Sequence, residues 1–270
     1  MGAAKANNRL PQTQQWSCCG RHVSEPPCGG SDEHLLPHDP GDRAHRNRWQ
    51  FYQTPALTQP GHRAAVSIDC EMGTAQDGEP ELIRITLVDY FSGATLVDTL
   101  VYPSVPMQHF NTRWSGVTRA QMEKARRSRR CLFGPAAARA AIFEHVGLAT
   151  VVVGHGLQND LACLRWLHGR IVDSYLIESG LREAAQREAE EEREMRGVDA
   201  PPTPPGPEKA ERGAGQQRRH PDGMSLKALA LKKLGRSIQG GKGHDSLEDA
   251  IAARDLVHSF VVDMSVPSVA

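Results

Sequence analysis

The sequence predicts an α/β fold in which a mixed β-sheet is flanked by helices. Three apolar, β-branched segments separated by turn residues lie between residues 64 and 102, and short apolar segments then alternate with helical patterns. With 270 residues, the chain is long enough for one sizeable domain and a small extra module. These patterns do not single out one architecture within the class.

The composition points to no global partner. The formal net charge is zero, so a site for a polyanion must come from a local basic patch or a bound cation. No apolar segment approaches about 20 residues and the polar N-terminus lacks a signal-peptide core, which predicts a protein that is neither membrane-spanning nor secreted. The cysteines are expected to be reduced, with Cys70 and Cys163 as plain core residues.

Residues 1–62 are polar, rich in Gly, Pro and His, and predicted to form a separate N-terminal region. Within it, Cys19, Cys28, His34 and His38 have the spacing C-x8-C-x5-H-x3-H, which could hold one structural Zn²⁺. The first gap is longer than usual, and the alternative is a tail with free thiols. Because the segment is too polar to form its own core, folding there would need the metal.

The first strands are "AAVSIDCE" at 64–71, "LIRITLVDY" at 82–90 and "TLVDTLVY" at 95–102, which read as an antiparallel meander. A helix follows in "SGVTRAQMEKA", where Thr118 and Gln121 have capping-box spacing. Pro135 suits the first turn of the next helix. The apolar "TVVVGH" is typical of a central strand.

The second half is predicted to continue with a helix in "NDLACLRWLH", which places Leu161, Leu164 and Leu167 on one apolar face, and a strand in "RIVDSYLI". Residues 181–222 break the pattern and predict an exposed charged helix followed by a disordered loop. A helix capped by Ser225 and ended by Gly235 comes next. The last helix follows a Gly-rich loop, and residues 264–270 form a tail.

Two carboxylates end the first strand. Asp69 and Glu71 point to the same face, and two adjacent like charges are costly unless a cation joins them. Read alone, Asp160 could serve a helix dipole, Asp249 could complete a capping box with Ser246, and His244 could be a surface loop residue. Together, the four acids are expected beyond the carboxyl ends of the strands, where open α/β sheets have their ligand-binding sites. Their hard oxygen ligands favour Mg²⁺ or Mn²⁺.

The segments "SIDCEMG", "GHGLQNDL" and "GHDSLEDA", in this order, resemble the three motifs of the DEDDh-type (DnaQ-like) 3′→5′ exonuclease superfamily. "DCEM" and "NTRWSGVT" are similar to the eukaryotic RNA exonuclease group. The resemblance covers residues 64–263 apart from 181–222, and the exonuclease domain is predicted at 63–263. It implies a ribonuclease-H-like, five-stranded mixed sheet of order 3-2-1-4-5, with Asp69, Glu71, Asp160 and Asp249 as ligands of two Mg²⁺ or Mn²⁺ ions and His244 as general base.

The resemblance also implies a substrate path. Met72, Gly73, Leu157 and Gln158 would border the terminal nucleotide, although each could equally be a loop or packing residue. Arg126 and Arg127, in the basic stretch "KARRSRR", are candidates for phosphate contact.

The expected function is hydrolysis of single-stranded nucleic acid from its 3′ end, with RNA favoured, in RNA processing or degradation. Two alternatives stay open, namely a DNA exonuclease and a catalytically silent nucleic-acid-binding module. Because "KARRSRR" could also serve nuclear import, the expected location is the nucleus, with the nucleolus as an option and the cytoplasm as the alternative.

Overall fold

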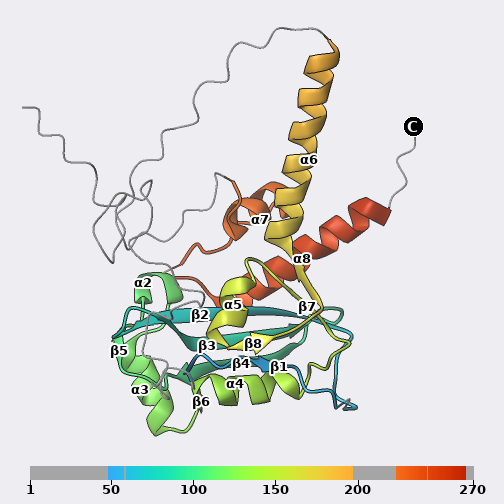
Figure 1. Ribbon diagram of the computed structural model, residues 1–270. Helices are drawn as coiled ribbons and strands as arrows, with labels where there is room; N and C mark the ends of the chain where they lie inside the picture. The colour runs from blue at the N-terminus through green and yellow to red at the C-terminus, as the bar shows by residue number, and fades with distance from the viewer. Residues whose placement is uncertain (1–47, 58, 197–222, 242, 266–270) are drawn as a thin grey trace, which may run out of the picture. The chain divides into compact units, whose positions relative to one another are not determined.

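The computed structural model describes residues 48–57, 59–196, 223–241 and 243–265 (Figure 1). The chain separates into two compact units, residues 1–50 and 51–270, and the second contains the sheet. The predicted zinc ligands Cys19, Cys28, His34 and His38 lie outside the described residues. So does the predicted disordered loop beyond residue 196.

The second unit is built on a mixed sheet of order β6-β4-β3-β2-β7-β9, in which β5 also pairs with β2. The bounds are β2 Ala65–Ala75, β3 Pro80–Asp89, β4 Thr95–Tyr102, β5 Met107–His109, β6 Cys131–Phe133, β7 Val151–Gly154 and β9 Ile171–Asp173. The antiparallel pairing of β2, β3 and β4 confirms the meander. The order β4-β3-β2-β7-β9 is the expected 3-2-1-4-5, and the short strands β5 and β6 were not predicted.

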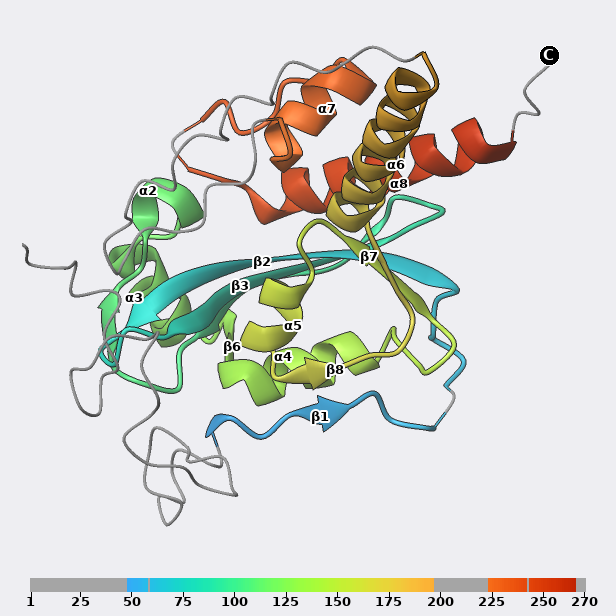
Figure 2. The same cartoon turned by 45° about the horizontal axis from the view of Figure 1, so that its top comes forward.

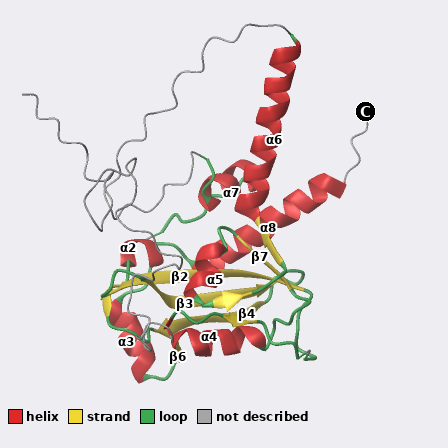
Figure 3. Ribbon diagram, viewed as in Figure 1, coloured by secondary structure: helices red, strands yellow, loops and turns green. Residues whose placement is uncertain are grey.

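Helices lie on both faces of this sheet (Figures 1 and 2). Their bounds are α2 Thr112–Ser115, α3 Arg119–Arg127, α4 Gly134–Phe143, α5 Gln158–Cys163, α6 Ser174–Met195, α7 Leu226–Leu234 and α8 Ser246–Ser265. Helix α8 packs against β2, β3 and β7, whereas α4 packs against β3, β4 and β6 from the opposite face. The colouring by secondary structure makes the three layers plain (Figure 3).

The core follows from these layers. Apolar side chains of β2, β3 and β7, among them Val66, Ile85 and Val152, pack with α4 and α5 in one buried cluster. A second cluster joins α7 to α8 and includes Ile238 from the connecting loop.

The local capping signals predicted helix ends correctly. Thr118 and Gln121 form the capping box of α3, and Ser225 caps α7 while Gly235 ends it in the left-handed region at φ 62°. These signals depend only on neighbouring residues, so the sequence alone was sufficient for them.

The helix predicted over 159–168 is wrong beyond Cys163. Arg165 adopts φ 52°, a left-handed conformation that ends α5, and Trp166–Leu167 then form the short strand β8. β8 pairs in parallel with β1, Tyr52–Gln53, so part of the segment assigned to the N-terminal region packs with the sheet unit. Leu167 is 49% exposed and does not share an apolar face with Leu164.

The charged segment after β9 is helical, as expected. The strand in "RIVDSYLI" ends at Asp173, and α6 begins at Ser174 and runs to Met195. Residues 185–195 of α6 are exposed, which agrees with an apolar stripe that is almost absent. Within the described part of the chain, no helix has the length and apolar character that a bilayer-crossing segment needs.

Candidate active site

Four carboxylates from three separate segments influence one another beside the middle of β2. The prediction that Asp69 and Glu71 end this strand is wrong, because β2 continues to Ala75 and pairs there with β3 and β5. Asp69 and Glu71 lie on β2 opposite Thr86 and Arg84 of β3. Asp160 lies in the first turn of α5, after β7, and Asp249 lies in the first turn of α8. Burial raises the pKa of Asp69 well above its usual range, and the charges of Asp160, Asp249 and Glu71 raise it further. The predicted acids are therefore brought together.

The same effects act on the other three acids. Burial and the charge of Asp249 raise the pKa of Glu71 to about 8, although Arg84 opposes this rise. Burial raises the pKa of Asp160 to about 7 and that of Asp249 to about 6. Buried like charges disfavour ionisation, so this site favours either protons or a cation.

One carboxylate oxygen has no hydrogen-bond partner. Glu71 Oε1 is buried and accepts no hydrogen bond from any described residue. A buried carboxylate oxygen without a donor is costly, and a hard cation is the kind of group that would satisfy it. The donor set of four carboxylates thus fits Mg²⁺ or Mn²⁺ chemically.

The described side chains do not form a complete set of metal ligands in their present positions. Among the residues that the structure describes, no three His, Cys, Asp or Glu side chains are grouped to hold a metal ion as they stand. Asp249 is instead engaged by Gln239, whose Nε2 donates to Oδ1 and Oδ2 at 3.2 and 3.0 Å.

His244 stands beside this group. Its Nδ1 lies 3.6 Å from Asp249 Oδ2, and its side chain is 38% exposed. Burial lowers the pKa of His244, and the nearby Lys227 charge lowers it further. The imidazole is therefore neutral near pH 7 and able to accept a proton.

The capping-box reading of Ser246 and Asp249 is wrong. Ser246 Oγ shares a hydrogen bond with Thr86 Oγ1 at 2.7 Å, and Asp245 Oδ1 accepts from the Leu247 N–H at 3.1 Å at the helix start. The Asp249 carboxylate is thus left for Gln239 and His244. Ser246 fastens the start of α8 to β3, next to the acids.

Cys70 is more than a core residue. Its backbone N–H and its thiol both hydrogen-bond to Asp160, which opposes the rise in the pKa of that acid. Strand alternation correctly predicts that Cys70 does not share a face with its two acidic neighbours, but α5 brings Asp160 to it. This contact between remote segments leaves no local signal in the sequence.

Asp173 was missed and supports the site. This buried carboxylate accepts from the N–H groups of Gly156, Leu157 and Tyr175 at 2.9, 2.8 and 2.9 Å. It therefore holds the turn that precedes Asp160 and also caps α6. An acid at the end of a strand, just before a helix, was the available signal.

The predicted substrate residues differ in their surroundings. Leu157 is fully buried in the core, which agrees with the packing alternative, whereas Gln158 is exposed. A Cβ at Gly73 would lie 2.5 Å from Met107 Cε and 2.9 Å from His109 O, so the close passage of β5 already requires this glycine. Met72 follows a bulge in β2 and packs partly against the core.

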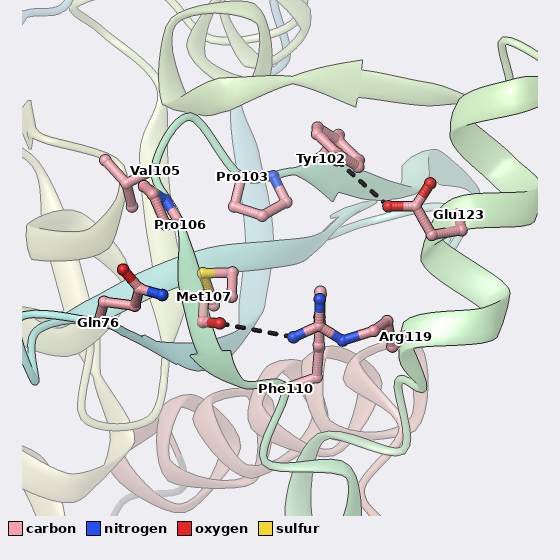
Figure 4. Close-up of a pocket in the computed structure, with 9 residues that line it drawn as sticks. All are labelled: Gln76, Tyr102, Pro103, Val105, Pro106, Met107, Phe110, Arg119 and Glu123. Carbon is pink, nitrogen blue, oxygen red and sulfur yellow. Dashed lines mark hydrogen bonds between the residues drawn. The ribbon is translucent and has the colours of Figure 1, made fainter.

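The two arginines predicted to contact phosphate are exposed on α3 but already have partners. Arg126 Nε pairs with Glu123 Oε2 at 2.9 Å and lies over the ring of Tyr102, while Arg127 Nε donates to Glu123 O at 3.3 Å. Glu123 and Tyr102 also line a pocket of about 240 Å³ between β5 and α3 (Figure 4). None of the four acids lines this pocket.

The chain is similar to curated proteins that are named as nucleases. It is 30% identical over 263 residues to RNA exonuclease 3 of Candida albicans, covering 93% of this chain and 52% of the relative. It is 33% identical over 203 residues to human apoptosis-enhancing nuclease, covering 71% and 48%. This similarity to proteins named as nucleases supports the predicted resemblance to the DEDDh-type exonuclease superfamily. It spans about half the length of these curated relatives, and no protein-family model matches it.

Two solved structures share the fold of this chain. The Neurospora crassa Pan2 catalytic unit, with protease and nuclease domains, matches with a TM-score of 0.53 at 19% identity over 81% of this chain and 30% of that one. The Saccharomyces cerevisiae Pan2 pseudoubiquitin hydrolase–RNA exonuclease module in complex with AAGGAA RNA matches at 0.52 and 20%, over 81% and 32%. A DEDDh-type exonuclease family implies dependence on divalent metal ions. The finer resemblance carried by "DCEM" stays a prediction.

Proposed function

We propose that the chain is a metal-dependent 3′→5′ exonuclease that hydrolyses single-stranded RNA. The observation that carries the proposal is the group of four mutually repelling, largely buried carboxylates beside a neutral histidine. A binding module would not need such a costly group, because it neither activates water nor stabilises a leaving group.

Asp69, Glu71, Asp160 and Asp249 would hold two Mg²⁺ or Mn²⁺ ions, which when bound supply a nucleophile at neutral pH and relief of charge in the transition state. The unpartnered Glu71 Oε1 supports this role for the acids. His244, kept neutral by burial and by Lys227, would take a proton as general base. Asp173 would keep the turn before Asp160 in place.

RNA is the preferred substrate in this proposal because one curated relative is named RNA exonuclease 3 and one structural neighbour is in complex with AAGGAA RNA. Met72, Gly73 and Gln158 would border the terminal nucleotide. Arg126 and Arg127 would approach phosphate only if their contacts with Glu123 were exchanged. RNA processing or degradation is the proposed cellular role.

The test is degradation of labelled RNA and DNA oligomers of one sequence, with Mn²⁺, by wild type and three variants. Asp69→Asn should abolish turnover, and His244→Ala should lower kcat by about 10²- to 10⁴-fold. Asp263→Asn, an exposed acid on α8, is the matched control and should retain wild-type activity. Faster DNA cleavage would support the DNA enzyme, and binding without product release would support the silent module.

Two further proposals concern the rest of the chain. Cys19, Cys28, His34 and His38 would hold one structural Zn²⁺, and a zinc content near zero in protein purified without chelator would contradict this. "KARRSRR" would direct the protein to the nucleus, where the nucleolus is a further option. Imaging of the tagged chain with these arginines replaced by glutamine, with retained nuclear signal as the contrary outcome, checks this location.

A further inference from the structure

We propose that α2 and its C-cap Gly116 form the docking element for the His244 loop, and that Trp114 and Gly116 are positioning residues for this histidine. The inference deepens the proposed function, since it takes His244 as the general base. It concerns the placement of the imidazole and not the proton transfer itself.

The first evidence is direct contact between His244 and Trp114. The backbone N–H of His244 donates to Trp114 O at 2.5 Å. The two rings also meet edge to face, with centroids 6.3 Å apart and planes at 86°. Main chain and side chain of His244 are therefore both held by one residue, which limits rotation of the imidazole away from Asp249.

The second evidence is a contact between two glycine backbones. Gly243 has φ 106°, and a Cβ at this position would lie 2.6 Å from Gly116 N and 2.7 Å from Gly116 Cα. Gly116 itself has φ 66° as the C-cap of α2. Only glycine combines this conformation with so close an approach, so the residue before His244 is suited to docking.

The third evidence is that α2 is fixed to the strand that carries two of the acids. The side-chain amide of Asn111, the N-cap of α2, donates to Met72 O at 3.2 Å, one residue beyond Glu71. Within the turn, Ser115 Oγ donates to Phe110 O and Thr112 Oγ1 donates to Val117 O, both at 2.7 Å. α2 therefore connects β2 to the His244 loop, and its own hydrogen bonds hold its turn in place.

The other side of the loop is held as well. Asp245 pairs with Arg84 of β3, with Nη1 and Oδ1 3.1 Å apart. The imidazole lies between this anchor and α2, with its Nδ1 facing Asp249. The position of His244 relative to the acids is therefore set from two directions, and α2 holds both its backbone N–H and its ring.

A matched pair of glycine variants tests the docking. Gly243→Ala forces the loop away from Gly116, whereas Gly241→Ala, two residues earlier, adds a Cβ that meets nothing within 4 Å. Gly243→Ala should lower kcat on single-stranded RNA by about 10- to 1000-fold, a smaller loss than complete removal of a general base can cause, with KM nearly unchanged. In the plot of kcat against pH, wild type should show a fall at low pH where His244 becomes protonated. Gly243→Ala and His244→Gln should both lack this fall. Gly241→Ala should match wild type in both.

A second readout does not depend on activity. The indole N–H signal of Trp114 in a ¹H–¹⁵N NMR spectrum, assigned with Trp114→Phe, should titrate with His244 in wild type and Gly241→Ala. The titration should vanish in His244→Gln and in Gly243→Ala. Lys227 and Asp249 are the charged groups that face His244, so Lys227→Met, which should leave the titration in place, excludes the lysine as its source.

The outcomes separate the two proposals. Equal kcat for both glycine variants, or an unchanged indole titration in Gly243→Ala, would overturn the docking. A wild-type protein without nuclease activity would overturn the proposed function, while the indole titration would still decide the docking. If Gly243→Ala fails to fold, Trp114→Ala should lower kcat and Trp114→Phe should restore most of it. Equal activity of these two Trp114 variants would overturn the docking.

Discussion

At the scale of the residue, Asp249 depends on Gln239. The Gln239 amide donates to both carboxylate oxygens, and this contact opposes the rise that burial causes in the pKa of Asp249. Gln239 is itself fixed, because its N–H donates to Glu248 Oε2 at 2.8 Å and its carbonyl accepts from Lys227 Nζ at 3.2 Å. A neutral donor keeps the acid oriented without competing with a cation for its charge.

Gln239→Leu should raise the pKa of Asp249 above about 6 and weaken Mn²⁺ binding by about 10- to 100-fold, the usual effect of removing a partner of a metal-binding carboxylate. Calorimetric titration with Mn²⁺ measures the affinity directly. Gln186→Leu on the exposed part of α6 is the matched control. Equal Mn²⁺ affinity for both variants would show that Gln239 does not contribute to metal binding.

At the scale of the element, α6 consists of two parts with different roles. Near its start, Glu178 is buried and pairs with Arg182 Nε at 2.9 Å and with Lys233 Nζ of α7 at 3.3 Å. Ile177 packs against the cluster of α7 and α8. Beyond Ala184 the helix is exposed, so its stability there rests on its own backbone hydrogen bonds.

Two proline variants on this one helix should therefore behave differently. Ser179→Pro interrupts the packed part and should lower the free energy of unfolding by about 3 kcal/mol or more. Ala189→Pro interrupts the exposed part and should lower the stability of the domain by less than about 1 kcal/mol, because that end can open locally. Urea unfolding measures both. A comparable loss for Ala189→Pro would mean that the distal part packs against the rest of the chain.

Element prediction from sequence worked where the signal was local. The meander, the caps at Thr118 and Ser225, and the charged helix follow from neighbouring residues, and the acids were found because three motifs carry them. The end of α5 was missed because the β8 backbone pairs with Tyr52, more than 100 residues away. Gln239 was missed for a similar reason, because its contact with Asp249 is made from a loop and follows no periodic pattern. Asp173 was missed although its position at the end of a strand and before a helix was an available signal.

At the scale of the whole molecule, the fold concentrates negative charge in a chain whose formal net charge is zero. The order β4-β3-β2-β7-β9 places β7 beside β2, and α8 packs against both strands, so acids from positions 69 to 249 meet beside β2. Without a cation this arrangement opposes folding at neutral pH. Repulsion between the buried carboxylates therefore lowers the free energy of unfolding of the whole domain, which can be measured.

The metal-free protein should lose stability as the pH rises. Glu71, Asp160 and Asp249 have pKa values of about 8, about 7 and about 6 in the folded chain, whereas the unfolded chain releases these protons at pH 4–5. Between these limits the folded state binds more protons, so the free energy of unfolding falls, by at most about 1.4 kcal/mol per pH unit for each retained proton. The stabilisation is complete below about pH 4 and is lost as the pH rises through 6 to 8.

Thermal unfolding of EDTA-treated protein from pH 5 to pH 8.5 measures this fall, and Mg²⁺ or Mn²⁺ added after removal of EDTA should reverse it. The gain in Tm from the metal should be large at pH 8 and small at pH 5, because protons and metal compete for the same oxygens. Glu71→Gln should flatten the pH dependence, and Asp263→Asn should leave it unchanged. Two outcomes would contradict this prediction: a Tm that does not depend on pH, or a gain in Tm from the metal that is equal at pH 5 and pH 8. Either would mean that the buried carboxylates do not interact with one another.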